Sequence, residues 1–183
     1  MAKLLGLLLT FAFPFFLLSC NKSGSGTTSN SDTAYLTCVM DGVSKSFNNA
    51  VTADTLSVAG INSIEISGFT NNSNKETLHL DISNSYEQPG QPIVTGTYTD
   101  TSSRFDLSSY YLLVINADST AQFEAGTVVA GQGDLIVNHL NIVVTSIAGG
   151  YIAGTFSGDY FSGGDPKAAK KAITGGQFYA KLQ

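Results

Sequence analysis

The sequence predicts one all-β domain over residues 34–183, and three observations support this fold class. Short stretches alternate apolar and polar residues, which is the period of two that a half-buried sheet requires. Thr, Val, Ile and Tyr are frequent in these stretches, and Gly, Asn, Asp and Ser separate them at short intervals. About nine or ten strands without covering helices must bury their faces on each other. We therefore expect a two-sheet β-sandwich of Greek-key or jelly-roll type, with a closed β-barrel as the alternative.

Residues 1–19 have the features of a lipoprotein signal peptide. Lys3 precedes an almost wholly apolar run over residues 4–18, and Ser19 supplies the small residue that a signal peptidase needs before Cys20. A helix of about 15 residues rises roughly 22 Å, which is too short for a hydrocarbon core of roughly 30 Å. The pattern resembles a bacterial lipoprotein signal, in which the cysteine is diacylated and becomes the first mature residue. An uncleaved membrane anchor and a plain secretory signal are the alternatives.

Residues 20–33 are predicted to connect the lipid to the domain. Residues 21–31 consist of Ser, Thr, Gly and Asn with one lysine, so they offer no apolar surface to bury. Two acyl chains on Cys20 would hold the protein stably on a membrane, whereas one chain binds only marginally. We therefore expect the membrane to be a partner of this protein through the lipid on Cys20.

Composition and charge bound the size of the domain and its partners. Removal of residues 1–19 from the 183 leaves 164, which is enough for one domain with a sizeable core. The formal charge is −5, and loss of Lys3 takes it to −6, because 14 acidic and 8 basic side chains remain. An acidic chain without a basic cluster is not expected to bind nucleic acid. We attribute the one close basic group, Lys167, Lys170 and Lys171, to a solvated surface.

The alternation assigns the side chains of the early strands to two faces. In residues 64–67 isoleucines alternate with a glutamate and a serine, and in residues 78–82 Leu, Leu and Ile alternate with His79 and Asp81. His79 and Asp81 are therefore expected on an outer sheet face.

Cys38 shares its strand face with Leu36 and Met40, which predicts a buried structural thiol. With Cys20 acylated, Cys38 has no partner for an internal disulfide.

The later strands follow the same pattern over longer stretches. Residues 110–115 are apolar on both faces, which favours a central strand. Residues 135–144 form the longest strand candidate, with a core face of Ile136, Leu140, Ile142 and Val144. In the last strand the expected core side chains are Phe178, Ala180 and Leu182.

One stretch breaks the β pattern. Asp165 is a good helix N-cap residue, Pro166 fits the first helical position, and alanines precede the lysines of a last turn. Residues 165–171 are therefore predicted to form one or two turns of helix in a loop between two late strands.

Candidates for catalysis or metal binding are few. His79 and Asp81 would share one sheet face, but a zinc site needs three or four ligands, and His139 falls on another strand. The sequence has no nucleophile elbow, no phosphate-binding loop that opens a helix and no calcium loop. We therefore predict no catalytic residue, no metal site and no cofactor.

Glycans are the substrate or ligand class that the sequence leaves open. Hydrolysis needs two carboxylates about 5 or 6.5–9.5 Å apart, and the candidates are Glu65, Glu76, Glu87 and Glu124. All but Glu87 lie on outward strand parities, where solvated charges are expected. Binding would instead use aromatic side chains, and the candidates are Tyr86, Tyr98, Tyr110, Tyr151, Tyr160 and Phe161.

An early strand and turn occupies residues 35–42, and Gly-Thr-aromatic and Gly-aromatic strand signals follow in residues 96–98, 152–158 and 173–178. Together with Cys20, these segments resemble a family of uncharacterised small β-rich lipoproteins of Bacteroidetes type. The resemblance implies a location in the outer membrane, and it supplies no catalytic residues.

Three Asp-Ser/Thr sequences resemble the O-glycosylation acceptor motif of exported proteins of the same type. The acceptors would be Thr33, Thr55 and Ser119. Chance occurrence in a chain rich in Asp, Ser and Thr is the alternative.

The function predicted from these features is a non-catalytic, lipid-anchored accessory or binding module of the bacterial cell envelope. One alternative is an envelope enzyme that acts on glycan or peptide by carboxylate chemistry, and another is a structural subunit that assembles through an edge strand. A cleft that gathers two or more carboxylates would favour the enzyme. An exposed aromatic row would favour ligand binding, and a long uncovered edge would favour assembly.

Overall fold

The computed structural model describes residues 33–70, 75–85, 88–117, 119–129, 135–136 and 139–183. Most of these residues lie in strands and none of them lies in a helix, which confirms the predicted all-β class. Residues Asp32–Gln183 form one compact unit.

The described strands number thirteen. They are β1 (Tyr35–Met40), β2 (Val43–Ser46), β3 (Asn49–Val58), β4 (Ile61–Phe69), β5 (Glu76–Asn84), β6 (Gly96–Thr99), β7 (Phe105–Asn116), β8 (Ser119–Gly126), β9 (Val128–Val129), β10 (Leu135–Ile136), β11 (Asn141–Ala148), β12 (Tyr151–Ser162) and β13 (Lys170–Lys181).

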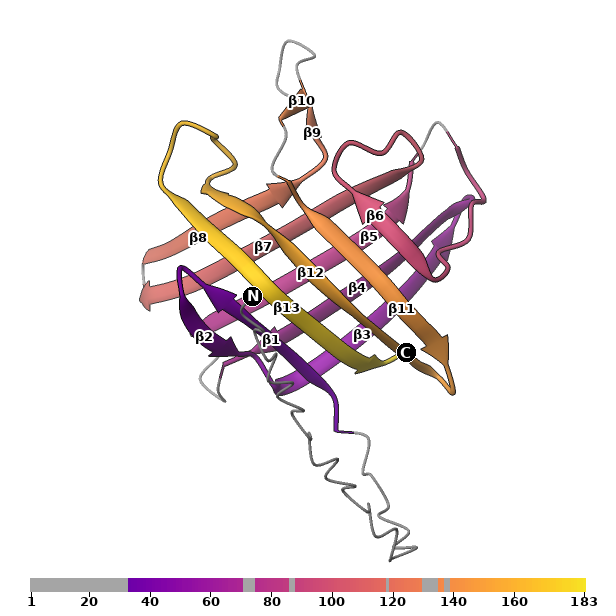
Figure 1. Ribbon diagram of the computed structural model, residues 1–183, viewed down its shortest axis with the longest axis horizontal. Helices are drawn as coiled ribbons and strands as arrows, with labels where there is room; N and C mark the ends of the chain where they lie inside the picture. Colours follow the sequence, from indigo (N-terminus) through magenta and orange to yellow (C-terminus); the bar gives the residue numbers. More distant parts are fainter. Residues whose placement is uncertain (1–32, 71–74, 86–87, 118, 130–134, 137–138) are drawn as a thin grey trace, which may run out of the picture. The chain divides into compact units, whose positions relative to one another are not determined.

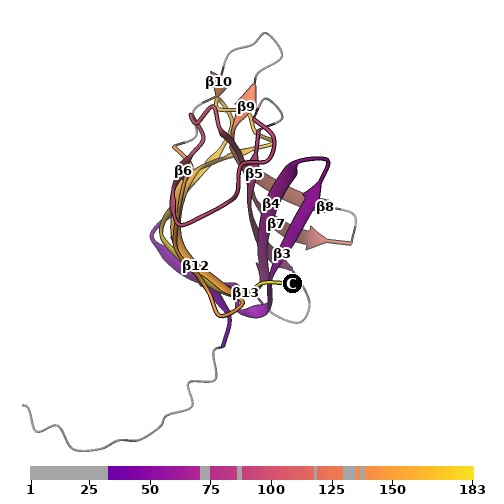
Figure 2. The ribbon, with the colours of Figure 1, turned by 90° about the vertical axis from the view of Figure 1, so that its right-hand side faces the viewer.

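Eleven of these strands form one antiparallel, strongly curled sheet. Its order is β2-β1-β13-β12-β8-β7-β5-β4-β3, with β11 paired to β12 and β6 paired to β11, while β9 and β10 pair with each other. Figure 1 shows β1, β13, β12 and β11 crossing in front of β8, β7, β5, β4 and β3 at a steep angle. Figure 2 shows the two groups as facing layers, so the sheet has the form of a half-barrel. We call them the β13 layer (β2, β1, β13, β12, β11, β6) and the β5 layer (β8, β7, β5, β4, β3).

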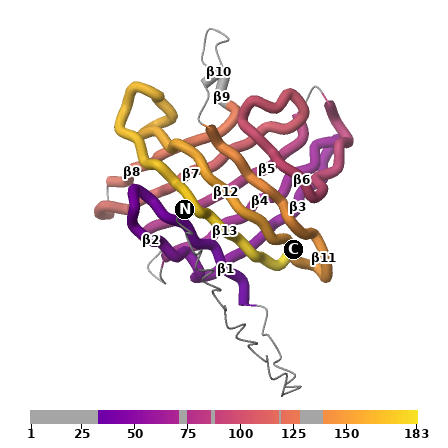
Figure 3. Tube along the Cα trace, in the orientation of Figure 1, coloured from indigo at the N-terminus to yellow at the C-terminus, as the bar shows by residue number. Residues whose placement is uncertain are grey.

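Two contacts hold the layers together at opposite sides. At one side β12 pairs with β8, where Phe161 lies opposite Glu124 and Ser162 opposite Phe123. At the other side the end of the chain runs along β3: a parallel bridge joins Ala53 to Leu182, and the Gln183 N–H donates to the Ala53 carbonyl at 2.9 Å. Figure 3 traces the path of the chain through both layers in the orientation of Figure 1.

The core lies between the two layers and takes side chains from both. The largest fully buried side chains are Tyr160, Phe47, Phe178, Leu36, Ile66, Leu78, Leu80, Ile82, Leu140, Ile142, Ile152 and Ile173. Burial of one such aliphatic or aromatic side chain contributes about 1.5–3 kcal/mol. The Tyr160 hydroxyl from β12 lies 2.5 Å from the Ser109 hydroxyl of β7, so this buried phenol has a polar partner.

The predicted face assignments are confirmed for most of the strands. Ile64 and Ile66, the apolar residues of 78–82, and Phe178 and Ala180 are all buried. Leu182 is only partly buried, because it lies at the sheet margin beyond β13.

The helix predicted over residues 165–171 is wrong. Residues 165–168 form a turn, in which the Ala168 N–H donates to the Asp165 carbonyl at 2.9 Å and the Lys167 N–H donates to Asp165 Oδ1 at 2.9 Å. Lys170 and Lys171 already belong to β13 and pair with Phe161 and Tyr160 of β12. Asp165 therefore makes the side-chain-to-backbone hydrogen bond expected of a capping residue. A helix does not follow, because Lys170 and Lys171 pair with β12 and too few residues remain for one.

The single long strand predicted over residues 135–144 is also wrong. The structure has the short strand β10 and the separate strand β11. His139 lies between them with a φ of 53°, a left-handed conformation that interrupts a strand ladder. His139 is therefore not a side chain of a strand face, whereas Leu140, Ile142 and Val144 are buried as predicted.

Candidate functional site: the two outer faces of the sheet

The outer face of the β13 layer carries a row of mostly polar, uncharged side chains across six strands. Neighbours in the row are register partners on adjacent strands, and the row reads Thr97 (β6), Val143 (β11), Thr155 (β12), Gln177 (β13), Thr37 (β1) and Ser46 (β2). Residues two apart on a strand point to the same face, and the buried residues of these strands alternate with the row. The row therefore faces solvent.

Three tyrosines stand beside this row in one stack. The ring centroids of Tyr35 and Tyr179 are 5.9 Å apart with an interplanar angle of 26°, and those of Tyr151 and Tyr179 are 4.9 Å apart with an angle of 3°. Tyr179 is thus enclosed by its two neighbours. The strand partner of Tyr151 on β11 is the small residue Ala148, and β2 begins to pair with β1 only at Thr37. The outward ring faces of Tyr35 and Tyr151 are therefore not flanked by a large cross-strand side chain.

This face of the β13 layer is nearly free of charge. Among its described outward side chains the only charged ones are Lys181, at the margin beside Tyr151, and Asp159 and Lys170 at the opposite margin. Asp159 and Lys170 neutralise each other in an ion pair of 3.2 Å. We call the surface formed by the six-strand row and the tyrosine stack the neutral face.

The outer face of the β5 layer is acidic. One cross-strand row reads Asp54 (β3), Glu65 (β4), Asp81 (β5) and Ser108 (β7), and the next reads Ser67, His79, Tyr110 and Glu124. His79 and Tyr110 stack with ring centroids 4.6 Å apart and an interplanar angle of 15°. We call this surface the acidic face.

The pKa of Asp81, on the acidic face, is far from its ordinary value. Burial and the neighbouring charges of Glu65 and Asp106 raise the pKa of its carboxyl to about 7, against the opposing hydrogen bond from Ser83. Its Oδ1 atom is buried without a hydrogen-bond partner. Burial lowers the pKa of His79, against the opposing charge of Glu65. The face therefore holds a carboxyl that keeps its proton to much higher pH than usual, beside an imidazole that favours its neutral form.

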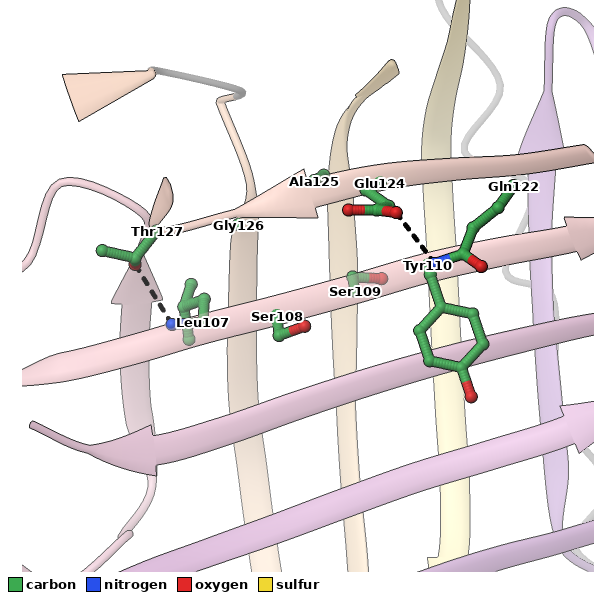
Figure 4. Close-up of a pocket in the computed structure, with 9 residues that line it drawn as sticks. All are labelled: Leu107, Ser108, Ser109, Tyr110, Gln122, Glu124, Ala125, Gly126 and Thr127. Carbon is green, nitrogen blue, oxygen red and sulfur yellow. Dashed lines mark hydrogen bonds between the residues drawn. The ribbon is translucent and has the colours of Figure 1, made fainter. Parts of the chain in front are cut away.

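A small pocket lies at the end of the acidic face, over β7 and β8. It has a volume of about 130 Å³, and Ser108, Tyr110 and Glu124 line it. Figure 4 shows Gln122, whose Nε2 donates to Glu124 Oε1 at 2.8 Å, and Thr127, whose hydroxyl accepts the Leu107 N–H at 3.1 Å. A volume of this size holds a few water molecules at about 30 Å³ each, so the pocket is too small for a sugar ring with its solvation.

A wider cleft of about 300 Å³ opens between the layers, beside β2 and the start of β5. Lys45 and Glu76 face each other across it in an ion pair of 2.8 Å, and Lys171 pairs with Asp41 at 3.0 Å. Burial and Glu76 raise the pKa of Tyr111 beside them to about 12. The Lys45–Glu76 pair joins the two layers, whereas Lys171 and Asp41 both belong to the β13 layer. Both ammonium groups are already paired, so they leave little charge for a ligand.

The structure places the predicted modification sites as follows. Cys20, Tyr86 and Glu87 lie outside the described residues. Thr33 is exposed before β1, Ser119 begins β8 and is partly buried, and the exposed Thr55 of β3 donates its hydroxyl to the Gln183 carbonyl at 2.8 Å.

The predicted sugar-binding aromatics divide between the core and the surface. Tyr98 and Tyr160 are buried, whereas Tyr110, Tyr151 and Phe161 are partly exposed. The sequence analysis missed Tyr35 and Tyr179. Their outward parity was readable from the alternation, but their contact depends on the β1–β13 register, which no local pattern specifies.

Cys38 is 4% exposed, and burial raises the pKa of its thiol to about 11, against the opposing charge of Lys45. A thiol of this kind is almost wholly protonated at neutral pH and is a weak nucleophile.

Neither a group of three metal-ligating side chains nor a helix long and apolar enough to cross a membrane occurs among the described residues. In comparisons with protein-family profiles, curated proteins and solved structures, nothing matches the chain. The resemblance to Bacteroidetes-type lipoproteins therefore stays a prediction.

Proposed function

We propose that the protein is a non-catalytic, lipid-anchored binding module of the bacterial cell envelope, held in the outer membrane by the lipid on Cys20. The observation that carries the binding role is the stack of Tyr35, Tyr179 and Tyr151 on the neutral face. Tyrosine is favoured at binding surfaces because it combines a large apolar ring with a hydroxyl at low conformational cost.

The expected class of binding partner follows from the membrane location that the leader predicts. A tether that ends on a diacylated cysteine keeps the domain beside the membrane. Components of the envelope are therefore at high effective concentration near the neutral face.

Pull-down from isolated native envelopes tests the binding role. The bait is the full-length lipoprotein in detergent, compared with Tyr179→Ala and with Tyr110→Ala, which removes the same side chain from the acidic face. We expect wild type and Tyr110→Ala to retain the same envelope component and Tyr179→Ala to lose it. Equal retention by all three proteins would remove the support for the neutral face.

A second candidate function is hydrolysis by carboxylates on the acidic face, and Asp81 is the observation that favours it. Asp81 and Glu65 are direct strand partners, a placement that sets their Cβ atoms about 4.5–5.5 Å apart and brings both carboxyl groups to one surface. Retaining glycosidases also use two neighbouring carboxyl groups. The pKa of about 7 for Asp81 suits a general acid.

Hydrolysis on the acidic face is tested by an activity assay. Turnover of an envelope glycan should fall to background in Asp81→Asn and in Glu65→Gln, and it should titrate near pH 7. Background turnover by wild type on envelope glycans, peptides and esters would leave the binding module as the function.

A further inference from the structure

We infer that the ligand of the neutral face is an uncharged polysaccharide that lies across the strands, along the row from Thr97 to Ser46 and against the tyrosine stack. This inference rests on the proposed binding function and names its ligand class. Four observations support it: the chemistry of the row, the form of the stack, the small number of charged side chains among the described residues of this face, and the position of the exposed aliphatic side chains.

The row offers the polar groups that sugar hydroxyls need. Five of its six side chains are hydroxyls or an amide, and each can donate and accept a hydrogen bond. Adjacent strands lie about 4.8 Å apart, so six strands extend the row over roughly 24 Å. A row of this length on the outer side of a curled sheet suits an extended chain of sugar rings better than a single small molecule, which needs a concave site.

The tyrosine stack offers the apolar component of the site. A pyranose ring has one face of C–H groups, and such groups pack on the electron-rich face of an aromatic ring. Tyr179 is covered on both sides, but Tyr35 and Tyr151 each present one ring face at an end of the stack. Small side chains, Ala148 and Ala153, lie next to Tyr151 and leave space above the sheet beside its ring.

The charge of the neutral face selects among polysaccharides. An anionic chain requires Lys or Arg along its path, yet among the described residues Lys181 is the one outward cation there without an ion pair. The described part of the row itself carries no carboxylate or ammonium group. An uncharged polysaccharide is therefore the complementary ligand.

The exposed aliphatic side chains argue against a protein or a lipid bilayer as occupant. Apolar anchors are typical of both kinds of interface. The large exposed aliphatic residues are Val43, Leu56, Val58, Val94 and Ile115, and all of them lie away from the neutral face, on the inner side of β2, on β3, before β6 and at the end of β7.

Retention on insoluble polysaccharides tests the inference. Full-length lipoprotein in detergent is mixed with cellulose, chitin or β-1,3-glucan as uncharged probes and with calcium-crosslinked pectate as an anionic probe. We expect retention on at least one uncharged polysaccharide, unchanged by 0.5 M NaCl, and none on pectate.

Paired variants locate the site. Tyr151→Ala and Thr155→Glu should each weaken retention about tenfold, whereas Tyr110→Ala and Ser108→Glu, the same changes on the acidic face, should not. Thr155 and Ser108 are both exposed, so these two substitutions test the site without disturbing the core. Circular dichroism melting of each variant verifies the fold.

Three outcomes would overturn the inference: no retention on any uncharged polysaccharide, retention on pectate alone, or equal loss with the acidic-face variants. If the envelope pull-down still depends on Tyr179 in any of these cases, the binding function stands and only its ligand class fails. If the pull-down also loses that dependence, both proposals fail.

Discussion

At the scale of single residues, partial burial on the outer sheet faces determines the protonation of the titratable side chains. Asp81 follows the outward parity that the alternation predicts, but its neighbours on β4 and β7 remove it from water. The position of a residue along its strand therefore predicts which face its side chain points to. The pKa of that side chain depends instead on the side chains that the adjacent strands place around it. The same applies to His79, which the sequence places in solvent and the structure stacks on Tyr110.

Asp81 should make the stability of the domain depend on pH. Its folded-state pKa of about 7 lies above the ordinary value near 3.9, so between these values the folded protein binds more protons than the unfolded chain. The free energy of unfolding should therefore fall as pH rises from about 4 to 7. Asp81→Asn should lose this component and be more stable than wild type at pH 8. Urea unfolding at several pH values measures it, with Asp54→Asn on the exposed margin as the control.

Cys38 should react slowly in the folded protein. Its burial and its raised pKa of about 11 leave little accessible thiolate. In the full-length lipoprotein, an aromatic disulfide reagent should label Cys38 slowly in buffer and rapidly in urea. Fast labelling in buffer would place the thiol at the surface and reopen a reactive role.

At the scale of elements, the packing of β12 explains the Gly-Thr-aromatic sequence at residues 154–156. Ile152 and Phe156 are buried on the core side of β12, and Gly154 lies between them. A Cβ atom on Gly154 would lie 2.1 Å from the Val143 carbonyl oxygen and 2.4 Å from the Phe178 ring. The glycine therefore makes room for an aromatic side chain of β13, and the signal is structural.

Gly154→Ala should destabilise the domain by about 1–3 kcal/mol, because the backbone and a packed ring must both move. Gly96→Ala on β6 is the matched control, since a Cβ atom there meets nothing within 4 Å. Thermal unfolding of the full-length protein should show a lower midpoint for Gly154→Ala, by about 2–4 °C per kcal/mol. Equal midpoints for the two variants would mean that the β12–β13 packing is looser than described.

At the scale of the whole molecule, the leader and the domain have separate predicted roles. The leader is predicted to direct the protein to a membrane, and we propose that the neutral face of the domain binds an envelope ligand there. Anchoring should therefore be separable from folding and from ligand binding.

Cys20→Ser should abolish lipid attachment. Wild type grown with labelled palmitate should carry the label and sediment with membranes, whereas the variant should carry none. A Cys38→Ser variant controls for the other cysteine and should keep the label. Label of equal intensity on Cys20→Ser, or its full retention in membranes, would contradict the anchor.

The sequence by itself determined the all-β class and the inward or outward direction of most strand residues. Period-two alternation is a property of the local backbone, so Leu78, Leu80 and Phe178 could be assigned to the core without knowing their neighbours. Prediction from the local sequence pattern was wrong where a short segment could adopt two conformations. Residues 165–171 have both helix-capping and strand features, and pairing with β12 decided between them.

Only the tertiary structure decided which strands are neighbours and how the sheet curls. Strand hydrogen bonds join residues far apart in the chain, and many pairings satisfy the same alternation, so total burial and turn geometry select one. That selection brings Tyr35 from the first strand against Tyr179 from the last and sets Asp81 beside Glu65. Both outer faces, and with them every functional proposal for the domain, depend on register, because a binding surface on a sheet is made of cross-strand neighbours.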